Sequence, residues 1–187
     1  MLNEAMIEEL VKISQFLCAK GFAPATKGNF SARLDDKSFV IGGANKDKSV
    51  FTKYDFIICD LQANVISGDA CADCATHLHG FIYNQSPYTN CVLQSYSKPI
   101  QVLSRLNQHQ PYIHLNEKRI VVYENNTNLL QNIQSQWETV KQQQTFVVHG
   151  LGLFSMGLTV FDAKRLMEEL EFLADCELSY LSTNQRI

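Results

Sequence analysis

The sequence has no strong charge of either sign, no apolar run long enough to cross a bilayer, and no basic, apolar leader at its N-terminus. The chain has sixteen Lys and Arg residues and nineteen Asp and Glu residues, so its formal net charge is only −3 at pH 7. A nearly neutral chain gives no electrostatic reason to expect nucleic acid or an anionic membrane as a partner. The missing leader and membrane span lead us to expect a cytoplasmic location.

Internal repeats are also missing, and the one low-complexity patch, Gln142–Gln144, reads as a polar loop. The six cysteines lie partly within apolar helix or strand patterns, where a free cysteine behaves as a small hydrophobic residue. Without a secretion signal we expect these thiols to be reduced. The 187 residues are 45% apolar, which predicts one domain over residues 1–187 with a substantial core.

Hydrophobic periodicity predicts helices and strands interleaved along the chain. Several strand pairs are joined too tightly for crossover connections, which favours a mixed or largely antiparallel sheet with helices on its faces. The segment from Gln108 to Lys118 reads as irregular. The helices are expected near residues 3–20, 70–85, 97–106, 127–137 and 160–178, and the strands near 30–34, 39–41, 56–60, 65–66, 91–96, 119–123, 145–149 and just beyond the turn at 150–152.

Two cysteines and two histidines cluster between Cys71 and His79, in the pattern Cys71, Cys74, His77, His79. In a helix, Cys71 and His77 would be separated by about 9 Å of rise, and the two imidazoles would point roughly 200° apart. Zinc needs four ligands close to one ion, so these are expected to be ordinary helix residues. A Cys-x-x-Cys pair at a helix start can instead have a lowered thiol pKa, so a thiol-based role is a lower-ranked alternative.

His149 is the second candidate for chemistry. It is predicted at the end of a buried strand, directly before a turn that carries Gly150 and Gly152. A backbone without side chains leaves room for an ion or a substrate beside the imidazole. A lone histidine near an apolar strand is nevertheless more often a hydrogen-bonded structural residue than a metal ligand.

Several segments together resemble the class II aldolase/adducin family, and within it they are most similar to the methylthioribulose-1-phosphate dehydratases. The matches are collinear and cover nearly the whole chain, and the opening segment and the closing helix are the most specific. The matching segments are Phe16–Asp35, Lys46–Lys48, Leu78–Tyr83, Val102–Arg105, His149–Leu151 and Leu170–Leu178.

The resemblance implies an α/β fold of three layers (αβα), with a central, mostly antiparallel mixed sheet between helical layers. It also implies a homo-oligomer, commonly a tetramer. Enzymes of this family hold a divalent metal, usually zinc, through a His-x-His at a strand end and a later His-Gly histidine. A glutamate acts as acid and base on a sugar phosphate, while the metal polarises a carbonyl and stabilises the enediolate.

Carried over residue by residue, this site is largely lost. Gln94 and Tyr96 stand where the His-x-His is expected, and Ala75 replaces the glutamate. An amide is a weak zinc ligand, a phenol must lose a proton with a pKa near 10, and a methyl group cannot transfer a proton. Asp73-Cys74 and Ala44-Asn45 replace the residues of two phosphate loops. The family residues that persist are His149, as a metal ligand, and Gly28, Asn29 and Ser31, as a phosphate or ligand cleft.

Metal, base and phosphate contacts are thus lost together while the core patterns remain. The first hypothesis is therefore a catalytically inactive family member without a cofactor, which acts as a binding or scaffold oligomer, with a small molecule as a possible ligand. The alternative is a zinc-dependent sugar-phosphate lyase, a dehydratase or aldolase, with a site rebuilt around His149. In that case His109 or His114 would join the metal, and Asp73 or Glu117 would act as base.

Overall fold

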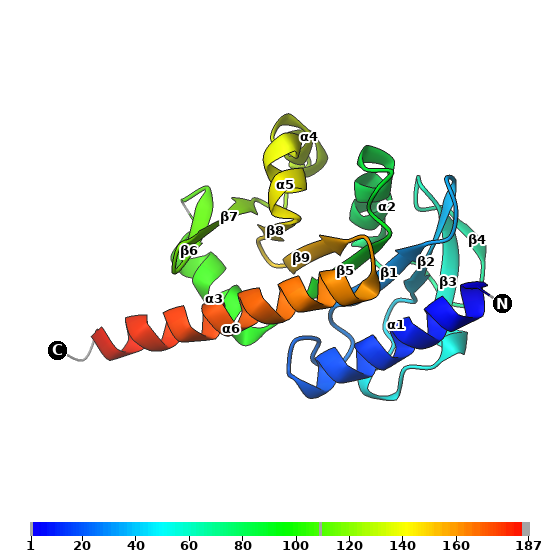
Figure 1. Cartoon of the computed structure of the whole chain (residues 1–187), viewed down its shortest axis with the longest axis horizontal. Coiled ribbons are helices and arrows are strands. Elements are labelled where there is room, and N and C mark those ends of the chain that lie inside the picture. The colour runs from blue at the N-terminus through cyan, green and yellow to red at the C-terminus, as the bar shows by residue number, and fades with distance from the viewer. Residues whose placement is uncertain (1, 109, 185–187) are drawn as a thin grey trace.

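The computed structural model describes residues 2–108 and 110–184, and in these residues nine strands form one sheet. The strands run in the order β4-β3-β2-β1-β5-β9-β8-β7-β6 across the sheet (Figure 1). Their bounds are β1 (Asn29–Arg33), β2 (Ser38–Gly42), β3 (Phe56–Asp60), β4 (Val65–Ser67), β5 (Cys91–Ser95), β6 (Tyr112–Leu115), β7 (Lys118–Tyr123), β8 (Thr145–Val148) and β9 (Gly152–Gly157).

Helices cover both faces of this sheet, as Figure 1 shows. One core lies between the sheet and α1 (Leu2–Ala19), α3 (Lys98–Leu106) and α6 (Val160–Asn184). A second core lies on the opposite face, under α2 (Thr76–Gln85), α4 (Leu129–Ser135) and α5 (Trp137–Gln143). The expected α/β fold of three layers with a central mixed sheet is therefore confirmed.

The sheet is antiparallel at every pairing except one. The strands β7 and β8 pair in parallel, with Tyr123 opposite Val148, and the helices α4 and α5 connect them. Parallel strands need such a crossover, and their carboxyl ends meet at one edge of the sheet. Glu124 and His149, the residues that follow these two strands, are therefore brought side by side.

Two of the helices predicted from the sequence, near residues 97–106 and 160–178, are confirmed, and a side chain caps the start of each. Ser97 caps α3 and accepts a hydrogen bond from the backbone N–H of Ile100. Before α6, Thr159 accepts from the N–H of Asp162, whose carboxylate accepts in return from the N–H of Thr159. These reciprocal bonds satisfy backbone donors that a helix start leaves unpaired.

Three predicted elements are wrong in extent. The helix expected from residue 70 begins only at Thr76, because the Asp73 side chain accepts from the N–H of Ala75 and folds the preceding residues into a turn. The segment expected to be irregular contains β6, which pairs with β7 as a hairpin. The helix expected after Thr127 is two short helices that break at Gln136; in the first of them Leu129 and Ile133 are buried, whereas Leu130 is 40% exposed.

Among the described residues, no helix combines the length and apolar character needed to cross a membrane. The longest, α6, has 25 residues and carries charged side chains from Asp162 to Glu177.

Candidate functional site

Two cavities lie at the ends of β5 and β8, and Tyr96 and Gly150 line both of them. The smaller has a volume of about 80 Å³ and the larger about 810 Å³. The smaller is lined by Thr26, Lys27, Gly28, Asn45, Asp73, Cys74, Gln94, Tyr96, Gly150 and Leu151. The larger is lined by Pro24, Tyr96, Lys98, Gln101, Arg105, Gln108, Glu124, His149 and Gly150.

Gln94 and Tyr96 both line the smaller cavity, as expected for alternate residues on one face of a strand. The Gln94 side chain is nearly buried, and its amide nitrogen donates to the carbonyl of Leu151 over 2.9 Å. The ammonium group of Lys27 lies 5.3 Å from the centre of the Tyr96 ring. Tyr96 thus borders both cavities, and a cation lies against its ring.

His149 is held by its backbone and by one acidic neighbour. Its N–H donates to the carbonyl of Tyr123 over 2.9 Å, and its Nε2 lies 3.4 Å from Oε1 of Glu124. Sequence reasoning missed Glu124. The signal was the strand–helix–strand pattern that ends in these two residues, because a parallel pairing of the strands aligns their ends.

The residues at the expected metal position do not fit a divalent ion. The Gln94 amide nitrogen is turned to a backbone carbonyl, and the His149 nitrogen faces Glu124 instead of other imidazoles. Among residues 2–108 and 110–184, no three His, Cys, Asp or Glu side chains come close enough to share an ion. A zinc site with four ligands therefore lacks its protein donors here.

The side chains proposed for a rebuilt site are dispersed. His114 lies on β6, Glu117 lies in the following turn, and neither lines the cavities that His149 lines. Asp73 lines only the smaller cavity of the two, and His109 lies outside the described residues.

Ala75 directly precedes α2, where its methyl group is buried among apolar side chains of the α2 face. It supplies neither a carboxylate nor a hydroxyl to the smaller cavity. No proton carrier therefore stands at the position where the family places its glutamate.

The three predicted cleft residues have different surroundings. Gly28 lines the smaller cavity, with a backbone φ of +78° that favours glycine. Asn29 is almost fully buried and lies opposite Gln94 in the β1–β5 pairing. Ser31 lies in the core, where its hydroxyl lies 2.7 Å from His79 Nδ1 and 2.7 Å from the Tyr83 hydroxyl. The Ser31 hydroxyl is thus engaged inside the protein.

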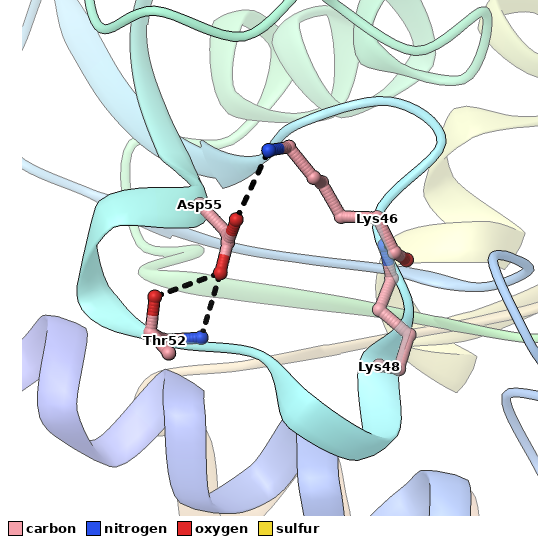
Figure 2. A network of polar contacts seen from close by, with 4 residues as sticks. All are labelled: Lys46, Lys48, Thr52 and Asp55. Carbon is pink, nitrogen blue, oxygen red and sulfur yellow. Dashed lines mark hydrogen bonds and ion pairs between the residues drawn. The ribbon is translucent and has the colours of Figure 1, made fainter.

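The loop that follows β2 is held by polar contacts to Asp55, as Figure 2 shows. The Lys46 ammonium group lies 3.2 Å from Oδ1 of Asp55, and the other oxygen of Asp55 accepts from the N–H and hydroxyl of Thr52. Lys48 is buried against the Phe51 ring, and burial lowers the pKa of its ammonium group to about 8. Neither lysine lines either cavity, so this loop contributes Asn45 and no cation.

The structure gives the thiol-based alternative no support. Cys71 precedes α2 by several residues, so it does not lie at a helix start. Partial burial, and then the Asp73 carboxylate, raise the pKa of the Cys74 thiol. A raised pKa lowers the share of thiolate, which is the reactive form of a cysteine.

Glu171 contacts the end of β5 from the face of the sheet that α6 covers. Its carboxylate is buried on α6 and accepts a hydrogen bond from the Ser95 hydroxyl. Its second oxygen has no hydrogen-bond partner among the described residues. Burial raises the pKa of Glu171 to about 7, although the neighbouring hydroxyl groups of Ser95 and Ser97 oppose the rise.

We expect the free energy of unfolding of Glu171→Gln, taken relative to wild type, to be higher at pH 8 than at pH 4.5. The pKa of this carboxyl group is raised in the folded state. Its contribution to the free energy of unfolding is therefore fully present below pH 4.5 and is lost as the pH rises to about 7. The variant should gain roughly 3 kcal/mol over that range, measured as its difference from wild type in urea unfolding. Glu168→Gln, one turn away, should keep the wild-type profile, and a flat difference for Glu171→Gln would contradict the assignment.

Residues 8–178 match the family model described as the class II aldolase and adducin N-terminal domain. The chain is 30% identical to a methylthioribulose-1-phosphate dehydratase of Serratia proteamaculans, with 95% of this chain and 96% of that protein covered. It is 31% identical to a methylthioribulose-1-phosphate dehydratase of Xylella fastidiosa, with 90% and 85% covered.

Solved structures resemble the fold at lower sequence identity. The l-fuculose-1-phosphate aldolase of Thermus thermophilus superposes with a TM-score of 0.79 at 21% identity, over 97% of this chain and 98% of that chain. A sugar-phosphate aldolase of Thermotoga maritima superposes with a TM-score of 0.80 at 17% identity, over 98% and 97%.

Proposed function

Because the chain belongs to the class II aldolase and adducin N-terminal domain family, we propose that it keeps the family fold but binds a small molecule without catalysing metal-dependent lyase chemistry. One observation carries the proposal. The nitrogens of Gln94 and His149 face a carbonyl and a carboxylate, so the side chains at the metal position are engaged with the protein itself. Similarity of fold does not decide the matter, since one fold supports many functions.

The acid/base position supports the same proposal. Ala75 has no group that could carry a proton between substrate and solvent. General acid–base catalysis contributes about 10²–10⁴-fold in typical enzymes. A lyase without this group and without a metal would retain little of its rate.

We also propose that the protein acts as a homo-oligomer, with a tetramer as the expected form. The long helix α6 exposes Phe161, Phe172 and Tyr180, each more than 60% accessible in the single chain. Exposed aromatic side chains on one helix favour burial against another protein surface. Light scattering of the purified protein measures the mass, and a monomer would contradict this part of the proposal.

A metal-dependent lyase, either a dehydratase or an aldolase, is the second candidate. Two observations favour it: the full-length similarity to methylthioribulose-1-phosphate dehydratases, and the Glu124 carboxylate beside His149. A carboxylate and an imidazole can both ligate zinc, but a third protein donor would have to join them.

Metal content and turnover decide between the two. We expect the purified protein, after dialysis against a mild chelator, to hold far less than one zinc per chain. We also expect no conversion of methylthioribulose 1-phosphate or fuculose 1-phosphate above the buffer rate. Near-stoichiometric zinc, or turnover, that disappears in His149→Ala would contradict the proposal.

The double variant Gln94→His/Tyr96→His provides the matched positive control. Gln94 and Tyr96 both line the smaller cavity, and Tyr96 also lines the larger cavity together with His149, so the two substitutions restore the three histidines that the family pattern has. We expect this variant to retain about one zinc per chain, because three imidazoles and a water complete a tetrahedral site. Failure of the double variant to bind zinc would show that the backbone at the metal position also differs from that of the family enzymes.

A further inference from the structure

A separate cavity lies where the end of α1, the start of α3 and the middle of α6 meet. Among the described residues it shares only Lys98 with the cavity that His149 lines, so it is distinct from the candidate site. Its volume of about 510 Å³ lies in the range of small-molecule sites, which runs from about 300 to 1,000 Å³. The cavity therefore has room for a second ligand.

One part of this cavity is apolar. Phe22, Pro99 and Phe172 form this apolar wall. Phe172 is 67% exposed on α6, whereas Phe22 is partly buried against the core. Burial of a hydrocarbon group against such side chains is favourable, because it removes apolar surface from water. The apolar wall therefore favours a ligand that carries a hydrocarbon group.

Two carboxylates of α6 form an acidic wall. Glu168 and Asp175 line the cavity from positions seven residues apart, which lie on one face of the helix. Glu168 pairs with Lys164, but Asp175 has no ion-pair partner among the described residues. A carboxylate without a cation beside it is a suitable acceptor for an ammonium group.

A third carboxyl group, that of Glu171, lies beneath the acidic wall. It is 1% exposed, and its Oε2 is buried without a hydrogen-bond partner among the described residues. Because Oε2 has almost no accessible surface, a ligand would affect Glu171 as a nearby charge and not by direct contact. On β5 it faces the Ser95 hydroxyl. The charged groups that line the same cavity are Lys20 after α1, Lys98 on α3, and Glu168 and Asp175 on its own helix.

Two cations from other elements form a basic wall. Lys20 directly follows α1, and Lys98 is the first residue of α3. In the part of the chain that the structure describes, neither ammonium group has a carboxylate within ion-pair distance. Lys20 lies 5.5 Å from the centre of the Phe16 ring. The cavity thus combines cations, a free carboxylate and hydrocarbon surface.

We infer that this cavity binds an α-amino acid with an apolar side chain. The ammonium group of the ligand faces the acidic wall, its carboxylate faces the basic wall, and its side chain lies against the apolar wall. A simple amine would leave both lysines without a partner, and a simple carboxylate would leave Asp175 without one, whereas a zwitterion satisfies both. The inference goes beyond the proposed function, since it assigns a second site away from the metal position.

Calorimetric titration at pH 7 tests the site with L-leucine and three analogues, each of which lacks one part of leucine. 3-Methylbutylamine lacks the carboxylate, 4-methylpentanoate lacks the ammonium group, and glycine lacks the apolar side chain. Leucine should bind, and each analogue should bind at least about tenfold more weakly, since it loses a charge-assisted hydrogen bond or the apolar contact.

Variants of the acidic and basic walls test the place of the ligand. Asp175→Asn and Lys20→Gln should each weaken the binding of leucine about tenfold. Glu177→Gln removes a carboxylate from α6 outside the cavity and should leave the dissociation constant unchanged. Arg105→Gln removes a cation that lines only the cavity beside His149, and it should also leave the constant unchanged.

Proton release provides a readout that is specific to Glu171. Burial raises the pKa of Glu171 to about 7, so at pH 7 about half of these carboxyl groups carry a proton. A nearby ammonium group favours the charged form of a carboxyl group and lowers its pKa. Titration in two buffers of different ionisation enthalpy should therefore show that leucine releases a fraction of a proton from wild type and none from Glu171→Gln.

Four outcomes would overturn the inference. They are no binding of leucine, equal binding of any analogue, weakening by Arg105→Gln instead of Asp175→Asn, and equal proton release from wild type and Glu171→Gln. Zinc content and turnover bear only on the proposed function, whereas the leucine series bears only on this cavity. Either proposal can therefore fail without the other.

Discussion

Gly152→Ala is expected to destabilise the protein by at least about 4 kcal/mol, which is among the largest effects of a single substitution. A Cβ atom at this position would lie 1.9 Å from the carbonyl oxygen of Ser95, and the backbone φ of +108° disfavours any residue with a side chain. Neither backbone can retreat, because β5 and β9 are paired here, with Ser95 opposite Leu153. Urea unfolding followed by circular dichroism measures the loss.

Gly150→Ala is the matched control for that substitution. Gly150 lies in the same turn and also has a positive φ, of +73°, but no atom lies within 4 Å of the Cβ that an alanine would add. Its cost should be about 1–2 kcal/mol, from backbone conformation alone. Equal stability of the two variants would show that the close approach of Gly152 to Ser95 is not what limits this position.

Replacing His79 with Gln is expected to remove a large part of the acid sensitivity of folding. His79 is completely buried, and burial lowers the pKa of its imidazole to about 3. Only the unfolded chain binds this proton between pH 6.5 and pH 3, so the stability is present above pH 6.5 and is lost as the pH falls. At about 1.4 kcal/mol per pH unit, wild type should lose roughly 2–3 kcal/mol more than His79→Gln between pH 6.5 and pH 4.5.

His77→Gln provides the comparison on the same helix, because His77 is exposed. It should keep the wild-type dependence on pH. The measured quantity is the difference in unfolding free energy between each variant and wild type at each pH, which cancels groups such as Glu171 that are common to both proteins. Parallel curves for wild type and His79→Gln would contradict a neutral, buried imidazole.

The layers of the fold could be predicted because periodic apolar residues and helix caps are local signals. The helices expected near residues 97–106 and 160–178 are present, and Ser97 and Thr159 cap their starts. The errors arose where a side chain or a distant strand overrides the local pattern. Asp73 holds a turn where the periodicity predicts helix, and β6 forms because β7 offers it a pairing edge.

The site was predictable in its side-chain types but not in its contacts. The sequence positions of Gln94, Tyr96 and His149 suffice to expect them near one another. The bond from Gln94 to Leu151 and the pairing of His149 with Glu124 depend on which strands lie parallel. The burial of Ser31 against His79 and Tyr83 likewise depends on how α2 packs on β1, which short-range patterns do not encode.

The end of β5 is secured by contacts that do not involve the side chains of Gln94 and Tyr96. Glu171 holds the Ser95 hydroxyl from behind, Gly152 abuts the Ser95 carbonyl, and the N–H of Tyr96 donates to the carbonyl of Phe22. These contacts therefore hold the backbone in place whichever side chains residues 94 and 96 have. In evolutionary terms, an ancestor could exchange either residue in a single step without first losing its fold, and a descendant could reverse the exchange just as freely.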